Sequence, residues 1–172
     1  MRTKLIARHI FAAFAIAALA LPSGAAVYSN GSKTATFDVT LKIVADCAIA
    51  ANALDFGQAQ GVISSGVRVS SNINVTCSNS TPYNVGLSAG TGTGSSGTTR
   101  YMSGTAGNTG TVQFNLLQSN GGPQWGNTQG TDTMAGTGNG TSQVLTVYGE
   151  IPVQATPAPD SYKSTITATV FF

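Results

Sequence analysis

Apolar and polar residues alternate strictly along several stretches of this chain, and such alternation is typical of β-strands that bury one face. In residues 34–43, threonines, Asp38 and Lys42 form one face, and the opposite face carries Ala35, Phe37, Val39, Leu41 and Ile43. Residues 67–77 repeat the pattern, and shorter runs predict strands at 83–87, 112–116, 144–151 and 162–172. Outside the N-terminal segment that is described below, no stretch of the chain shows a convincing 3.6-residue apolar period. The sequence therefore predicts an all-β domain built as an antiparallel sandwich.

Turn clusters rich in Gly, Pro, Asn and Asp separate these strands. Two longer inserts, residues 88–110 and 126–142, consist mainly of Gly, Ser, Thr and Asn. Since they carry little apolar surface to bury, we expect both to be long, mobile surface loops. Residues 92–97 spell G-x-G-x-x-G, a nucleotide-binding pattern only between a strand and a helix, and no helical pattern follows. We therefore expect a flexible loop there.

The N-terminus has the features of a secretory signal peptide. Arg2, Lys4 and Arg8 precede an apolar run from Ile10 to Leu21, which is followed by Pro22 and small residues. The run is shorter than the roughly 20 residues that a membrane-spanning helix needs. We expect cleavage after Ala25 or Ala26, no stable membrane insertion, and a mature domain of residues 26–172.

Removal of the first 25 residues changes the charge of the chain. Three of the eight basic residues are lost, which leaves five against six acidic residues. Because no basic patch remains to contact a phosphate backbone, the composition disfavours nucleic-acid binding.

Cys47 and Cys77 are the two cysteines of the chain. In a secreted protein a pair of cysteines predicts a disulfide bond. A loop of this length makes the bond worth about 3 to 4 kcal/mol on the loop-entropy estimate.

Residues for catalysis or metal binding are scarce. The only histidine is His9, in the expected signal peptide, so nucleophile–base catalysis and Cys/His zinc binding lack their usual groups. Six carboxylates remain and could in principle pair as in glycosidases, although their positions near strand ends favour a role in solubility: Asp38, Asp46, Asp55, Asp132, Glu150 and Asp160. We expect no enzymatic activity and no cofactor.

Three further side chains have alternative interpretations. Arg68 and Arg100 could contact a ligand, but lone arginines on polar faces are usually solvated, and we expect that of both. Trp125 could stack on a sugar ring, but its place at a strand–loop corner favours packing.

Four blocks of sequence, taken in order, resemble the spore coat protein U family, whose members are archaic chaperone-usher pilus subunits. The blocks are ATFDVTLKIVADCAIAANALDFG, INVTCSNSTPYNVGLSAG, VQFNLLQSNGGPQWG and VYGEIPVQATPAPDSYKSTITATVFF. The pattern Tyr148-Gly149-x-Ile151-Pro152, followed by a proline-rich corner and an alternating terminal strand, is the most specific part.

The resemblance implies an incomplete immunoglobulin-like antiparallel β-sandwich that lacks its final strand and is completed by donor-strand complementation. It implies three partners: a periplasmic pilus chaperone, an outer-membrane usher and neighbouring pilus subunits. It also implies export through the periplasm of a Gram-negative bacterium to a cell-surface pilus.

The alternating segment before the first cysteine is the candidate donor strand. The extension spans about residues 27–42, and the side chains expected to enter a neighbour's groove are Phe37, Val39, Leu41 and Ile43. The alternative is that the segment is the protein's own first strand, and the two roles could divide it at a residue that the sequence does not specify. On the receiving side, the C-terminal strand is expected to border the groove with Ile166, Ala168, Val170 and Phe172.

The expected function is that of a structural, fibre-forming pilus subunit involved in surface attachment and biofilm formation. Two alternatives remain. One is a single-domain adaptor or adhesin near the fibre tip, and the other is a secreted spore-coat or matrix protein of the same fold.

Overall fold

A computed structural model of the chain describes residues 30–58, 63 and 65–172. The chain divides into two units, residues 1–41 and 42–172. The expected signal peptide lies outside the described residues. In the first unit, residues 30–41 are exposed and contain neither helix nor strand.

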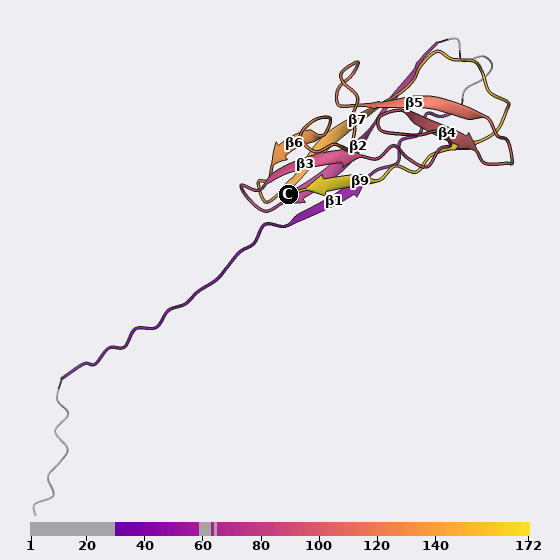
Figure 1. Ribbon diagram of the computed structural model, residues 1–172. Coiled ribbons are helices and arrows are strands. Elements are labelled where there is room, and N and C mark those ends of the chain that lie inside the picture. The colour runs from indigo at the N-terminus through magenta and orange to yellow at the C-terminus, as the bar shows by residue number, and fades with distance from the viewer. Residues whose placement is uncertain (1–29, 59–62, 64) are drawn as a thin grey trace, which may run out of the picture. The chain divides into compact units, whose positions relative to one another are not determined.

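The second unit is all-β in its described residues, as the alternation predicts (Figure 1). The strands are β1 (Cys47–Ala51), β2 (Val67–Cys77), β3 (Pro82–Leu87), β4 (Arg100–Gly104), β5 (Thr111–Leu117), β6 (Met134–Thr137), β7 (Ser142–Ile151), β8 (Tyr162–Lys163) and β9 (Ala168–Phe171). One sheet has the order β1-β2-β7-β5-β4-β8 and the other the order β6-β3-β9. Every pairing between these strands is antiparallel, so the predicted antiparallel architecture is confirmed.

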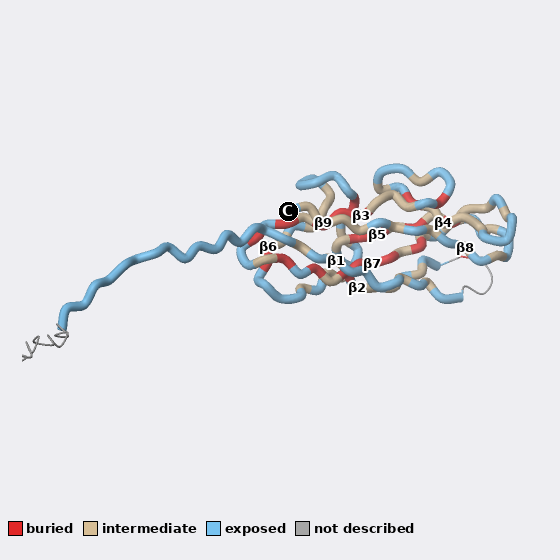
Figure 2. Tube along the Cα trace, turned by 90° about the horizontal axis from the view of Figure 1, so that it is seen from below, coloured by how far each residue is buried: buried red, intermediate tan, exposed pale blue. Residues whose placement is uncertain are grey.

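The two sheets bury a common core. Alternate residues of β2, β5 and β7 face the three-stranded sheet, whose β3 contributes Tyr83, Val85 and Leu87. The buried positions of β3, β5 and β7 appear as red segments in Figure 2. At one edge a disulfide between Cys47 and Cys77, with an S–S length of 2.01 Å, joins β1 to β2, as the cysteine count predicts.

Two predicted strands differ from the structure. Residues 34–43 form no strand, and their apolar side chains are exposed. Residues 162–172 do not form one strand either. Instead, β8 pairs with β4 and β9 pairs with β3, and residues 164–167 cross from one sheet to the other.

The expectation that both inserts are surface loops throughout is also wrong. The first insert contains β4, which pairs with β5, and the second contains β6, which pairs with β3. In the first insert, a Cβ atom at Gly92 would overlap the backbone carbonyl of Tyr101. This glycine therefore permits close packing, which composition alone does not distinguish from looseness.

Candidate strand-binding groove

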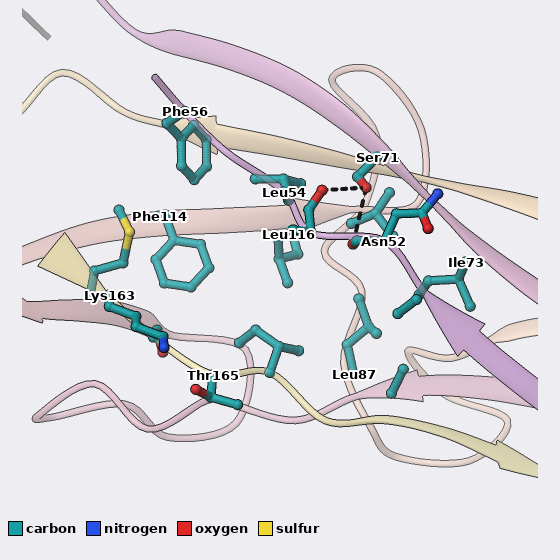
Figure 3. Close-up of a pocket in the computed structure, with 17 residues that line it drawn as sticks. Asn52, Leu54, Phe56, Ser71, Ile73, Leu87, Phe114, Leu116, Lys163 and Thr165 are labelled. Carbon is teal, nitrogen blue, oxygen red and sulfur yellow. Dashed lines mark hydrogen bonds between the residues drawn. The ribbon is translucent and has the colours of Figure 1, made fainter. Parts of the chain in front are cut away.

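An elongated groove opens between the N-terminal and C-terminal parts of the second unit. Its first section, about 580 Å³, lies between residues 51–56 and residues 163–168. Figure 3 shows apolar side chains from both banks and the floor facing this space. The floor comes from both sheets and consists of Ile73, Leu87, Phe114, Leu116 and Val147, so the groove exposes part of the common core.

A second section of about 870 Å³ continues the first. The two sections share Leu54, Phe56 and Met102. The second section runs between residues 54–58 and residues 156–162. One bank of the continuous groove is therefore residues 51–58, and the other is residues 156–168.

Hydrogen bonds to β2 hold the first bank in place. The Asn52 N–H donates to the Asn72 carbonyl at 2.9 Å, and the Ser71 hydroxyl donates to the carbonyls of Asn52 at 3.1 Å and Ala53 at 2.8 Å (Figure 3). Beyond them, the rings of Phe56 and Phe114 pack edge to face, with centroids 6.2 Å apart. The apolar side chains of this bank thus reach across to the floor.

The second bank is held by the first Gly-rich insert. The Ser164 hydroxyl oxygen accepts hydrogen bonds from the backbone N–H groups of Thr91 and Gly92, both at 3.2 Å. The Thr165 N–H donates to the Thr91 hydroxyl oxygen at 2.9 Å. The insert that the composition predicts to be a mobile loop is therefore a fixed support of the groove.

At one end the groove reaches two edge strands, since it is lined there by Ala51, the last residue of β1, and by Ala168, the first residue of β9. β1 pairs with β2, and β9 pairs with β3, and neither has a second partner among the described residues. A strand edge of this kind presents free N–H and C=O groups to an incoming chain. The floor offers apolar contacts and the edges offer backbone hydrogen bonds, which together suit an extended peptide.

The structure divides the predicted groove residues into two groups. Ile166 and Ala168 line the groove, and Val170 packs against the core from β9. Phe172 is 58% exposed and lines neither section. The prediction missed Leu54 and Phe56, although the two large apolar residues flank Asp55 shortly after β1.

The predicted donor side chains are largely exposed. Phe37, Val39, Leu41 and Ile43 are 80–86% exposed. They alternate with polar residues, so in an extended strand they would form a row of large apolar side chains on one face.

The expectation that Arg100 is solvated is wrong. Its side chain is fully buried, with the Nη2 donating to the carbonyls of Leu87 at 2.8 Å and Trp125 at 2.7 Å. Burial lowers the pKa of Arg100 to about 10, and the negative charge of Asp132 opposes the shift. Trp125 is also fully buried and donates from its indole N–H to the Val85 carbonyl at 2.7 Å, as the packing interpretation predicts.

Within residues 30–58, 63 and 65–172, no group of three His, Cys, Asp or Glu side chains could hold a metal ion. In the same residues, no helix is long and apolar enough to cross a membrane.

Comparisons with known proteins agree with this geometry. The family model of the Spore Coat Protein U domain matches residues 33–169. A comparison with curated proteins finds no significant match.

Among solved structures, the chain is similar to a chain of the CsuC-CsuE chaperone-tip adhesion subunit pre-assembly complex, from the archaic chaperone-usher Csu pili of Acinetobacter baumannii. The TM-score is 0.57 at 21% identity, and the match covers 76% of this chain and 40% of that one. At this identity the similarity shows the fold.

Proposed function

Because the chain belongs to the Spore Coat Protein U domain family, we propose that it is a structural subunit of a fibre assembled by the chaperone-usher pathway. Each subunit receives in its groove the N-terminal segment of the next copy. The donated segment includes residues 34–43, with Phe37, Val39, Leu41 and Ile43 directed towards the groove floor.

One observation carries the proposal: the same chain has an open apolar groove and an uncovered apolar strand-like segment. The bank at residues 156–168 can span at most about 43 Å if it is fully extended, at about 3.3 Å per residue. Residues 34–43 extend over about 33 Å on the same basis. The donor segment is thus short enough to lie along this bank, and its apolar face suits the apolar floor.

Burial of the donor side chains supplies enough free energy for a stable polymer. Each large apolar side chain contributes roughly 1.5 to 3 kcal/mol when fully buried. The four together contribute about 6 to 12 kcal/mol as an upper estimate, before backbone hydrogen bonds. This range is comparable to the stability of a whole domain, so a filled groove would behave as part of the folded core.

An uncovered groove explains the need for partners during export. In the periplasm, a chaperone would cover the apolar floor, and at an outer-membrane usher the next subunit would replace it. The structural neighbour belongs to a complex of a chaperone and a tip adhesion subunit, which supports a chaperone partner. The product is a cell-surface fibre that promotes attachment and biofilm formation without catalysis.

The test is expression in a periplasm with the cognate chaperone and usher, followed by electron microscopy of the cell surface. We expect fibres from the wild type and none from the double variant Val39→Asp, Leu41→Asp, since two carboxylates would have to be buried in the groove. The matched control is Thr36→Asp, Thr40→Asp, which adds the same charges to the opposite face and should form fibres. Normal fibres from the first variant, or abundant stable monomer without any chaperone, would contradict the proposal.

A biofilm assay on the same strains tests the attachment role. Loss of biofilm in the fibre-less variant, but not in the threonine-face control, is expected. Equal biofilm in all strains would refute attachment while leaving fibre assembly intact.

A further inference from the structure

Arg100 is a buried cation that contacts the backbone immediately behind the groove floor. Besides its bonds to the Leu87 and Trp125 carbonyls, its Nε donates to the Ser88 carbonyl at 2.9 Å. The side chain is fully buried. Several charge-assisted donors in one rigid plane therefore fix the positions of three carbonyl groups relative to β4.

Each of these carbonyl groups is joined to the groove. Leu87 is itself a floor residue. Two hydrogen bonds of 2.9 Å join Ser88 to Thr167, the residue before β9. The Ser88 N–H donates to the Thr167 carbonyl, and the Thr167 N–H donates to the Ser88 hydroxyl oxygen. The Trp125 N–H donates to the carbonyl of Leu116, another floor residue, at 2.8 Å.

These contacts cross from one sheet to the other. Arg100 lies on β4 in the six-stranded sheet, opposite Phe114 of β5, whereas Leu87 ends β3 in the three-stranded sheet. The guanidinium thus sets the separation of the two sheets where the groove passes between them. Closure of the walls of an empty apolar groove on each other removes apolar surface from water and lowers the free energy. A fixed cross-link between the sheets opposes that closure.

We propose that Arg100 is a positioning residue for strand capture: it keeps the groove floor and the β9 edge at the spacing that a donated strand requires. This inference rests on the proposed fibre function. Arg100 does not touch the incoming strand in this account, and it acts through Leu87, Ser88 and Trp125. It also gives the first Gly-rich insert a role, since the Ser88 backbone belongs to that insert.

The experiment compares three variants of the full chain. Arg100→Met keeps the length of the side chain but removes every donor, and Arg100→Lys keeps the charge without the planar set of donors. Val75→Ala is the control, because Val75 is a fully buried core residue that does not line the groove. Each variant is examined for its unfolding midpoint, for the rate at which its purified fibres dissociate in denaturant, and for hydrogen exchange at residues 87–88 and 165–171.

We expect Arg100→Met fibres to dissociate at least about tenfold faster than Val75→Ala fibres when the two are compared at equal distance from their unfolding midpoints. Arg100→Lys should not restore the wild-type rate. Exchange at residues 165–171 should increase selectively in the Arg100 variants. Dissociation rates that follow the unfolding midpoint alone, or rescue by lysine, would overturn the inference.

Hydrogen exchange on the chaperone-bound subunit separates this inference from the proposed function. If the wild type forms no fibres, the fibre proposal fails. The positioning role is still tested, because it predicts that Arg100→Lys selectively increases hydrogen exchange at residues 165–171 in that complex. It fails if exchange at these residues equals that of Val75→Ala. Should Arg100→Met fail to fold, Arg100→Lys decides both measurements.

Discussion

Leu41→Ala tests whether the uncovered apolar face of residues 34–43 is buried in another molecule. Leu41 is 85% exposed in its own chain, so its truncation should leave the unfolding of residues 42–172 unchanged. In a fibre the same side chain would be buried, and its loss removes roughly 1.5 to 3 kcal/mol of the free energy that joins neighbouring subunits. Since each 1.4 kcal/mol corresponds to a factor of ten, dissociation should become about 10 to 150 times more favourable.

The assay is the dissociation of purified fibres by guanidinium chloride, followed by the appearance of monomer on gels. Thr40→Ala is the matched control, because Thr40 is the neighbouring residue on the polar face of the segment. We expect the midpoint for Leu41→Ala fibres to fall well below that of the control, whose midpoint should stay close to the wild-type value. Coinciding midpoints for the two alanine variants would refute the burial of Leu41 and the assignment of the donor face.

Three other predictions concern the domain itself. Replacing both Cys47 and Cys77 by serine should lower the free energy of unfolding by about 3 to 4 kcal/mol in denaturant titrations, and unchanged stability would contradict the loop-entropy argument. Arg68 donates a hydrogen bond of 2.6 Å to the Glu150 carboxylate and lowers its pKa in the folded state. The pair therefore stabilises the fold above the unfolded-state pKa of about 4.3, and this stabilisation is lost as the pH falls through the lower folded-state pKa. Arg68→Gln should remove this pH-dependent contribution and lower the free energy of unfolding at neutral pH by less than about 1 kcal/mol, because the Arg68 side chain is 63% exposed. A larger loss at neutral pH would be inconsistent with this account. Gly90→Ala should destabilise the second bank and weaken fibres, because φ is +87° at this position and the new Cβ would lie 2.5 Å from the Ser164 hydroxyl oxygen. The control is Gly107→Ala, which has a similar φ of +84° but open space around it, so that it introduces the backbone strain alone. Equal fibre stability in the two variants would exclude steric support of the groove by the insert.

Alternation alone predicted four of the strands that pack within the domain. β2, β3, β5 and β7 bury alternate residues against a common core, and a period of two specifies both the strand and its buried face. The same rule predicted a strand at 34–43, where the structure shows no strand and the apolar side chains are exposed. Periodicity records that a face is suited to burial, and it does not specify which molecule covers it.

The supports of the groove were not predictable from composition. A Gly/Ser/Thr-rich segment normally indicates a mobile loop, and the order of residues 88–104 depends on the buried guanidinium of Arg100 and on the hydroxyl groups of Thr91 and Ser164. The contacts of Thr91 and Gly92 with Ser164 and Thr165 join residues more than 70 positions apart in sequence. No local pattern marks them, whereas the paired cysteines and the apolar residues of the C-terminal strand are visible in the sequence itself.

The most direct test of the account is chemical cross-linking of fibres assembled from an equal mixture of unlabelled and ¹⁵N-labelled chains. In the described residues the lysines are Lys33, Lys42 and Lys163, of which the first two belong to or flank the donor segment and the third lines the groove. An amine-reactive cross-linker should join Lys42 to Lys163, and mass spectrometry should find mixed-isotope pairs as often as the two same-isotope pairs together. Cross-links confined to chains of one label would show that the segment folds onto its own domain, and would contradict strand donation between subunits.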